Sequence, residues 1–133
     1  MNESGATSPK TVEEFVGAAH GNIDRVRELL DEDSTMANAT WDWGGGDWET
    51  ALGAAAHTGR RDIAELLLAQ GARVDVFAAA MLGQLDVVRA MLTVTPTALD
   101  HLGPHGISLA DHAEAGGDEA APVVAYLASL AGG

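Results

Sequence analysis

Apolar residues recur along the chain at the three-and-four spacing of amphipathic helices, in short segments that come in pairs. The spacing is clearest over residues 23–30, 63–68 and 85–92, and it predicts three helices that each have one apolar face. An alanine-rich segment that ends near a glycine precedes each of them, which predicts a second, shorter helix. Because no single helix of this kind covers its own apolar face, the pairs must stack on one another to form a core.

The pairs share a repeated pattern of two adjacent alanines, a glycine, an aspartate and then two adjacent apolar residues. The glycine of the pattern is Gly21, Gly59 and Gly83 in three copies, and Gly117 in a looser fourth copy. Successive glycines are 38, 24 and 34 residues apart, so the repeat is irregular. The sequence therefore predicts an all-α solenoid of about four helix pairs, whose first and last copies act as caps.

Capping residues mark where the first helix of each pair begins. Thr11, followed by a glutamate three residues later, has the pattern of a capping box. Thr50, Asp75 and Ser108 stand at equivalent positions in the other three copies. We therefore expect a flexible tail over residues 1–10 and a single repeat domain over residues 11–133.

The most specific pattern lies at residues 47–75. It reads DWETALGAAAHTG at 47–59, IAELLL at 63–68 and GARVD at 71–75. This resembles the ankyrin repeat family, and the resemblance extends over about residues 11–130. It implies an array in which β-hairpin fingers and the first helices line a groove, usually for binding a protein. Trp48, Ala51 and Gly53 depart from the glycine, proline and histidine of the family pattern.

The spacing of the repeats is irregular at two of the expected β-hairpin fingers. Residues 40–49 read TWDWGGGDWE and predict an enlarged finger, whereas Asp75 runs almost directly into the next alanine-rich segment, so the following finger is absent. Helices pack roughly 8 to 10 Å apart, so the missing finger leaves a candidate pocket of about that width. Its walls would be the enlarged finger and residues 102–106. By the resemblance, its floor would be Met81 and Leu82, with His57 and Thr58 at the same positions of the second copy.

All tryptophans of the chain, Trp41, Trp43 and Trp48, lie in the enlarged finger around a glycine triplet. Large aromatic side chains are rarely left in a solvated loop without a role. Two interpretations stay open. The tryptophans line a ligand-binding pocket, or the enlarged finger folds back and uses them as a small core of its own.

Four residues are candidates for proton transfer. The resemblance places His57 and His105 on the groove face near acidic residues, and an imidazole beside a carboxylate acts as a general acid or base near neutral pH. The candidate carboxylates are those of Asp47 and Glu49. The alternative is that both histidines only satisfy local hydrogen bonds. Two repeat steps, roughly 16 to 20 Å, are expected between Asp47 and His105, so they are not expected to form a direct pair.

No metal site and no cofactor are expected. Gly103 and Pro104 prevent the helix that would place His101 and His105 on one face, and the chain has no cysteine. His20 and His112 fall on predicted first helices and are expected to be structural.

Charge narrows the range of partners. The 133 residues contain 7 Lys and Arg against 20 Asp and Glu, a net charge of −13, which disfavours binding to nucleic acid or to anionic membrane surfaces. No apolar stretch is long enough to span a bilayer, and the chain has neither an export signal nor cysteines, so a cytoplasmic location is expected.

Two hypotheses about function follow. The first is an ankyrin-type binding module that engages a protein or an apolar small molecule through its tryptophan-rich finger and concave groove. The second is a small enzyme on the same scaffold, of the isomerase, cyclase or hydratase type, in which Glu49, Asp47, His57 or His105 moves protons in a Trp-lined pocket. The missing finger favours a pocket over a long flat groove, but no complete catalytic set is visible in the sequence.

Overall fold

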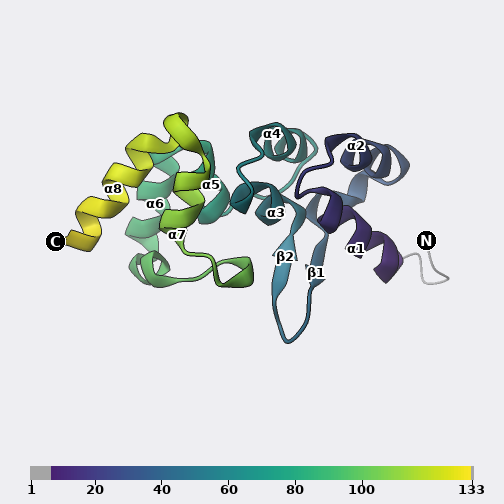
Figure 1. The fold of residues 1–133 in the computed structure, drawn as a ribbon, viewed down its shortest axis with the longest axis horizontal. Helices are drawn as coiled ribbons and strands as arrows, with labels where there is room; N and C mark the ends of the chain where they lie inside the picture. Colours follow the sequence, from purple (N-terminus) through teal and green to yellow (C-terminus); the bar gives the residue numbers. More distant parts are fainter. Residues whose placement is uncertain (1–6, 133) are drawn as a thin grey trace.

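The structure, a computed structural model that describes residues 7–132, is a row of stacked helix pairs with one projecting hairpin (Figure 1). The pairs are α1 (Pro9–Ala18) with α2 (Ile23–Glu32), α3 (Ala51–His57) with α4 (Arg61–Ala69), α5 (Val76–Leu82) with α6 (Leu85–Val94), and α7 (Leu109–Ala115) with α8 (Ala121–Gly132). Short 3-10 helices lie between them: η1 (Ser34–Asn38), η2 (Pro96–Asp100), η3 (Pro104–Gly106) and η4 (Gly117–Ala120). The predicted all-α array of four helix pairs is confirmed.

Three of the four predicted helix starts are also confirmed. The side chains of Thr50, Asp75 and Ser108 accept the backbone N–H three residues further on, at the starts of α3, α5 and α7. Each cap satisfies a backbone donor that has no partner within its helix.

The predicted start of the first helix is wrong. The N-cap of α1 is Ser8, whose hydroxyl accepts from the N–H of Thr11 at 3.3 Å, and Pro9 takes the first helical position, where its missing N–H costs nothing. The Thr7 hydroxyl donates to the carboxylate of Asp33 at 3.0 Å. Residues 7–10 are therefore part of the fold, and the rest of the predicted tail, residues 1–6, lies outside the described residues.

Two glycines allow the last pair to stack closely on the others. Gly59 and Gly83 have φ values of 69° and 77°, which residues with a Cβ rarely adopt. A Cβ at these positions would collide with the carbonyl oxygens of Ala115 and Glu119, respectively. The pairs therefore approach one another backbone to backbone at these turns.

The core runs along the row between the paired helices. Its largest fully buried side chains in the first two pairs include Phe15, Leu52, Ile63 and Leu67. Fully buried alanines of α3 and α5 let these neighbouring helices lie close together. Among the described residues, no helix combines the length and apolar character that crossing a membrane requires.

The enlarged finger is a two-stranded antiparallel hairpin. Its strands are β1 (Thr40–Asp42) and β2 (Trp48–Thr50), with Trp41 opposite Glu49. The hairpin extends away from the helix stack, and β1 packs against α1 (Figure 1). No finger separates α4 from α5, as the sequence predicts. A loop over residues 101–108, closed by a bridge between Leu102 and Ser108, lies on the side of the stack that carries the hairpin.

Candidate functional site

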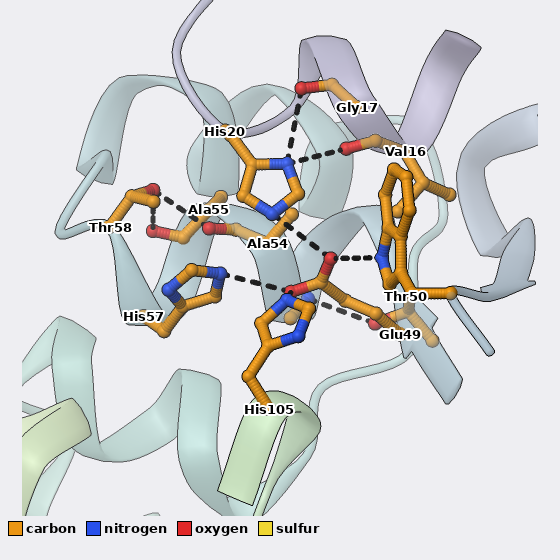
Figure 2. Close-up of polar contacts among 12 residues, drawn as sticks. Val16, Gly17, His20, Glu49, Thr50, Ala54, Ala55, His57, Thr58 and His105 are labelled. Atoms are coloured by element: carbon orange, nitrogen blue, oxygen red, sulfur yellow. Dashed lines mark hydrogen bonds and ion pairs between the residues drawn. The ribbon is translucent and has the colours of Figure 1, made fainter. Parts of the chain in front are cut away.

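Three histidines surround the carboxylate of Glu49, whose side chain has no exposed surface (Figure 2). The Nε2 atoms of His20, His57 and His105 lie 3.0, 3.0 and 3.2 Å from its oxygens. His20 follows the end of α1, His57 ends α3 and His105 lies in η3. Three segments that are distant in the sequence thus converge on one residue of the hairpin.

The alternation of strand β2 explains why Glu49 points inward. Neighbouring side chains of a strand point to opposite faces, so Trp48 is 60% exposed while Glu49 is buried. The next residue, Thr50, caps α3. This cap fixes the strand to the helix, and Glu49 is thereby held against the helix ends that carry the histidines.

One oxygen of Glu49 has a hydrogen bond and the other has none. The indole Nε1–H of Trp43 donates to Oε1 at 2.9 Å. Oε2 and the Nε2 atom of His57 are both buried and without a hydrogen-bond partner, although they lie 3.0 Å apart. A buried polar atom without a partner costs free energy, so this pair of atoms is the unusual feature of the site.

The opposite ring nitrogens of two histidines have partners that orient the rings. Nδ1 of His20 lies 3.1 Å from the carbonyl oxygens of Val16 and Gly17. Nδ1 of His105 lies 2.7 Å from Oδ2 of Asp47, whose Oδ1 also accepts the backbone N–H of His105 at 2.7 Å. These contacts turn both Nε2 atoms toward Glu49.

The backbone of His105 takes up a strained conformation to make these contacts. Its φ of 61° lies in the left-handed region, and among the described residues no other non-glycine residue has a positive φ.

The contacts between these residues also change their pKa values. The backbone N–H and the ring of His105 lower the pKa of Asp47. Burial lowers the pKa of His57, and the neighbouring Glu49 opposes this effect.

A cavity of about 400 Å³ opens next to this cluster, between the hairpin and the loop over residues 101–108. Six of its lining residues are Trp48, Gly53, Phe77, Leu102, Gly103 and Pro104. Its position agrees with the predicted gap, since the enlarged finger forms one side and residues 102–104 the other.

The predicted floor of the pocket is wrong. Met81 is completely buried in the core and Leu82 is nearly so, and neither lines the cavity. Because α5 begins at Val76, its first turn reaches the cavity through Phe77, and Met81 lies one turn further along. Thr58 does not line the cavity either, since its hydroxyl donates to the carbonyl oxygen of Ala54 at 2.7 Å.

The three tryptophans have different surroundings. Trp41 packs against the core of the first pairs, Trp43 bonds to Glu49 and is partly exposed, and Trp48 lines the cavity. The hairpin therefore has no small core built from its tryptophans.

The structure brings together residues that the sequence prediction separated. Asp47 and His105 are in direct contact at 2.7 Å instead of two repeat steps apart. The missing finger explains the difference, because the loop that carries His105 occupies the space a finger would fill and reaches the hairpin.

From the sequence, His20 was expected to be structural and was not placed in the site. This histidine follows two alanines in the first copy, as His57 follows two alanines in the second, so the repeat pattern contained a signal for it. His112 lies apart from the four-residue cluster, buried on α7, with Nδ1 2.7 Å from the carbonyl oxygen of Ser108.

Part of the chain matches a known family. Residues 47–78 match the family model of the ankyrin repeat, from the residue before β2 to the first turn of α5. This confirms the resemblance read from residues 47–75. No protein with a curated description matches the chain.

Proposed function

We propose that this chain, which carries an ankyrin repeat at residues 47–78, binds a protein partner by receiving one of its apolar side chains in the cavity beside Trp48. Ankyrin repeats mediate protein interactions, which supports a binding module in general. The location of the binding surface rests on a single observation. Two large apolar side chains, Trp48 and Leu102, line the cavity and are 60% and 64% exposed to water.

The free-energy cost of exposing these side chains to water favours a partner side chain that covers them. Burying apolar surface stabilises a complex by roughly 25 cal/mol per Å², and large aromatic residues are frequent at the centre of protein interfaces. A partner side chain of the size of Leu, Phe or Trp would contact Trp48, Phe77 and Leu102 together.

Charge indicates what should flank that side chain. The chain carries a net charge of −13, and Asp75 lines the same cavity. We therefore expect a partner segment in which Lys or Arg lies next to the apolar residue, because opposite charges speed association and orient the partner.

The geometry favours binding over proton transfer. The Nε2 atoms of His20, His57 and His105 lie against Glu49, and none of these residues lines the cavity. A general base needs to reach the proton that it removes, and here the ring nitrogens face the protein's own carboxylate.

A selection of random peptides displayed on phage tests this proposal. Peptides selected on the folded chain are synthesised, and their affinity is measured by fluorescence polarisation. We expect an aromatic or large aliphatic residue beside Lys or Arg, and a loss of affinity of at least about tenfold in Trp48→Ala and Leu102→Ala. Val94→Ala is the matched control, because Val94 is an exposed apolar residue on α6 outside this cavity. Selected peptides that bind Trp48→Ala as tightly as the unaltered chain, or a selection that enriches no sequence, would rule the proposal out.

A further inference from the structure

We propose that Glu49 and the three histidines around it form a binding site for one divalent transition-metal ion, with Zn²⁺ as the preferred ion. One ligand atom from each of His20, Glu49, His57 and His105 lies within 4.8 Å of the others. Three imidazole nitrogens and a carboxylate oxygen are a donor set that Zn²⁺ accepts in four-coordinate sites.

The hydrogen-bond partners of His20 support this inference. Its Nδ1 lies 3.1 Å from two carbonyl oxygens, which accept hydrogen bonds and cannot donate them. In the neutral ring the proton is therefore on Nδ1, and the lone pair of Nε2 points toward Glu49 at 3.0 Å. Nε2 and Oε1 of Glu49 are both electron-rich, and at this distance they repel each other unless a proton or a metal ion lies between them.

The unpartnered atoms at the centre of the cluster point the same way. Oε2 of Glu49 and Nε2 of His57 are buried, 3.0 Å apart, and have no hydrogen-bond partner. Nε2 of His105 is a further neighbour of Oε2, at 3.2 Å. A single metal ion would bind all three of these atoms at once, whereas one hydrogen bond joins only two of them.

The distances approach those of a tetrahedral site, which the ligands would reach by small movements in both directions. With bonds of 2.0–2.1 Å, the ligand atoms of tetrahedral Zn²⁺ lie about 3.4 Å apart. The contacts of His57 and His105 with Oε2 of Glu49, at 3.0 and 3.2 Å, and that of His20 with Oε1, at 3.0 Å, are slightly shorter than this value. The wider separations in the cluster, up to 4.8 Å, would shorten when the ion binds.

The groups behind the ligands match those that surround metal sites. Metal-bound histidines usually donate their other ring N–H to a carboxylate or a backbone carbonyl. His105 faces the carboxylate of Asp47, and His20 faces the carbonyls of α1. The indole of Trp43 bonds to Oε1 of Glu49, which His20 also faces, whereas Oε2 faces His57 and His105.

The four ligands would complete the coordination shell, so this is a structural site rather than one with an open position for chemistry. The ion would join the end of α1, the hairpin, the end of α3 and the loop over residues 101–108. The side chains of the three histidines are 14% to 33% exposed, which gives the ion a path from solvent. The inference is independent of the proposed partner, since it rests on the cluster and not on the cavity.

Metal content and affinity test the inference. The tag-free chain is stripped with a chelator, given Zn²⁺, and passed through a desalting column before its zinc content is measured. We expect about one Zn²⁺ per chain. Co²⁺ in place of Zn²⁺ should produce the visible absorption of a tetrahedral site. Titration against a chromophoric chelator then gives the affinity of each variant, and circular dichroism confirms that each variant is folded.

Three variants and a control separate metal binding from general effects. His57→Ala and Glu49→Gln remove ligands and should lower zinc affinity at least about 100-fold, while Asp47→Asn changes only a group behind a ligand and should lower it about 10- to 100-fold. His101→Ala is the control, because His101 is exposed and outside the cluster. If His57→Ala fails to fold, the zinc affinity of Asp47→Asn tests the inference in its place. A stripped chain that retains no Zn²⁺, variants that bind it as the unaltered chain does, or an equal loss in His101→Ala would overturn the inference.

Discussion

At the scale of single residues, Glu49 depends on its neighbours for its stability in the interior. A buried carboxylate is costly unless its oxygens have hydrogen-bond or ionic partners. Its one hydrogen bond among the described contacts comes from the indole of Trp43. The Nε2 atoms of the three histidines are its other polar neighbours. The free-energy cost of burying Glu49 therefore depends on the cation, a proton or a metal ion, that lies between these atoms and the carboxylate.

The Trp43→Phe variant tests the role of this hydrogen bond. Phe keeps an aromatic ring but removes the donor, so Oε1 of Glu49 loses its hydrogen bond from the indole. We expect the free energy of unfolding to fall by about 1–3 kcal/mol, the usual cost of an unsatisfied buried polar group.

Urea denaturation measures the change, and Trp48→Phe serves as the control. Trp48 is 60% exposed and is not a donor to Glu49, so its substitution should change stability by less than about 0.5 kcal/mol. Equal effects of the two substitutions would contradict the role assigned to the indole.

At the scale of secondary structure elements, the turns between helices determine how closely the pairs stack. Gly83 ends α5 with a φ of 77° and lies against the backbone of η4. The contact joins the third pair to the fourth, which carries the loop containing His105 at its start. Substitutions at this turn should therefore loosen the last pair.

Gly83→Ala should destabilise the chain more than Gly71→Ala does. Both glycines have positive φ, 77° and 96°, so both substitutions strain the backbone at a cost of about 1–2 kcal/mol. Only at Gly83 would the new Cβ meet the carbonyl of Glu119, since nothing lies within 4 Å of a Cβ at Gly71. Thermal or urea unfolding of the two variants provides the comparison. A cost at Gly83 that is no larger than that at Gly71 would mean that the close approach to η4 does not matter.

At the scale of the whole molecule, stability comes from the contacts between neighbouring pairs. Each pair exposes apolar surface that the next pair covers, so the array is expected to unfold in a cooperative manner. Leu67 of α4 has no exposed surface and lies in the core shared by the first pairs.

Leu67→Ala should reduce the free energy of unfolding by about 2–5 kcal/mol, the range found when a buried leucine leaves a cavity. A urea melt followed by circular dichroism measures the loss. A change below about 0.5 kcal/mol, typical of a surface position, would contradict the helix pairing.

Much of the fold could be predicted because its signals are local. The three-and-four spacing of apolar residues identified the helix pairs, and the caps at Thr50, Asp75 and Ser108 identified three helix starts. The short distance from α4 to Asp75 also revealed the missing finger. The error at α1 had a local cause too, since Ser8 and Pro9 form a cap that competes with the pattern at Thr11.

The candidate site depended on distant contacts, which local patterns do not contain. Glu49, Asp47 and His105 were chosen from the sequence for their chemistry, but the spacing of repeats placed Asp47 and His105 far apart. Their contact exists because the loop over residues 101–108 fills the place of the missing finger and reaches the hairpin. His20 joins them only through the stacking of α1 beside α3. Helical periodicity and caps act over a few residues, whereas the path of a loop across the stack depends on the packing of the whole chain, and that packing assembles the cluster around Glu49.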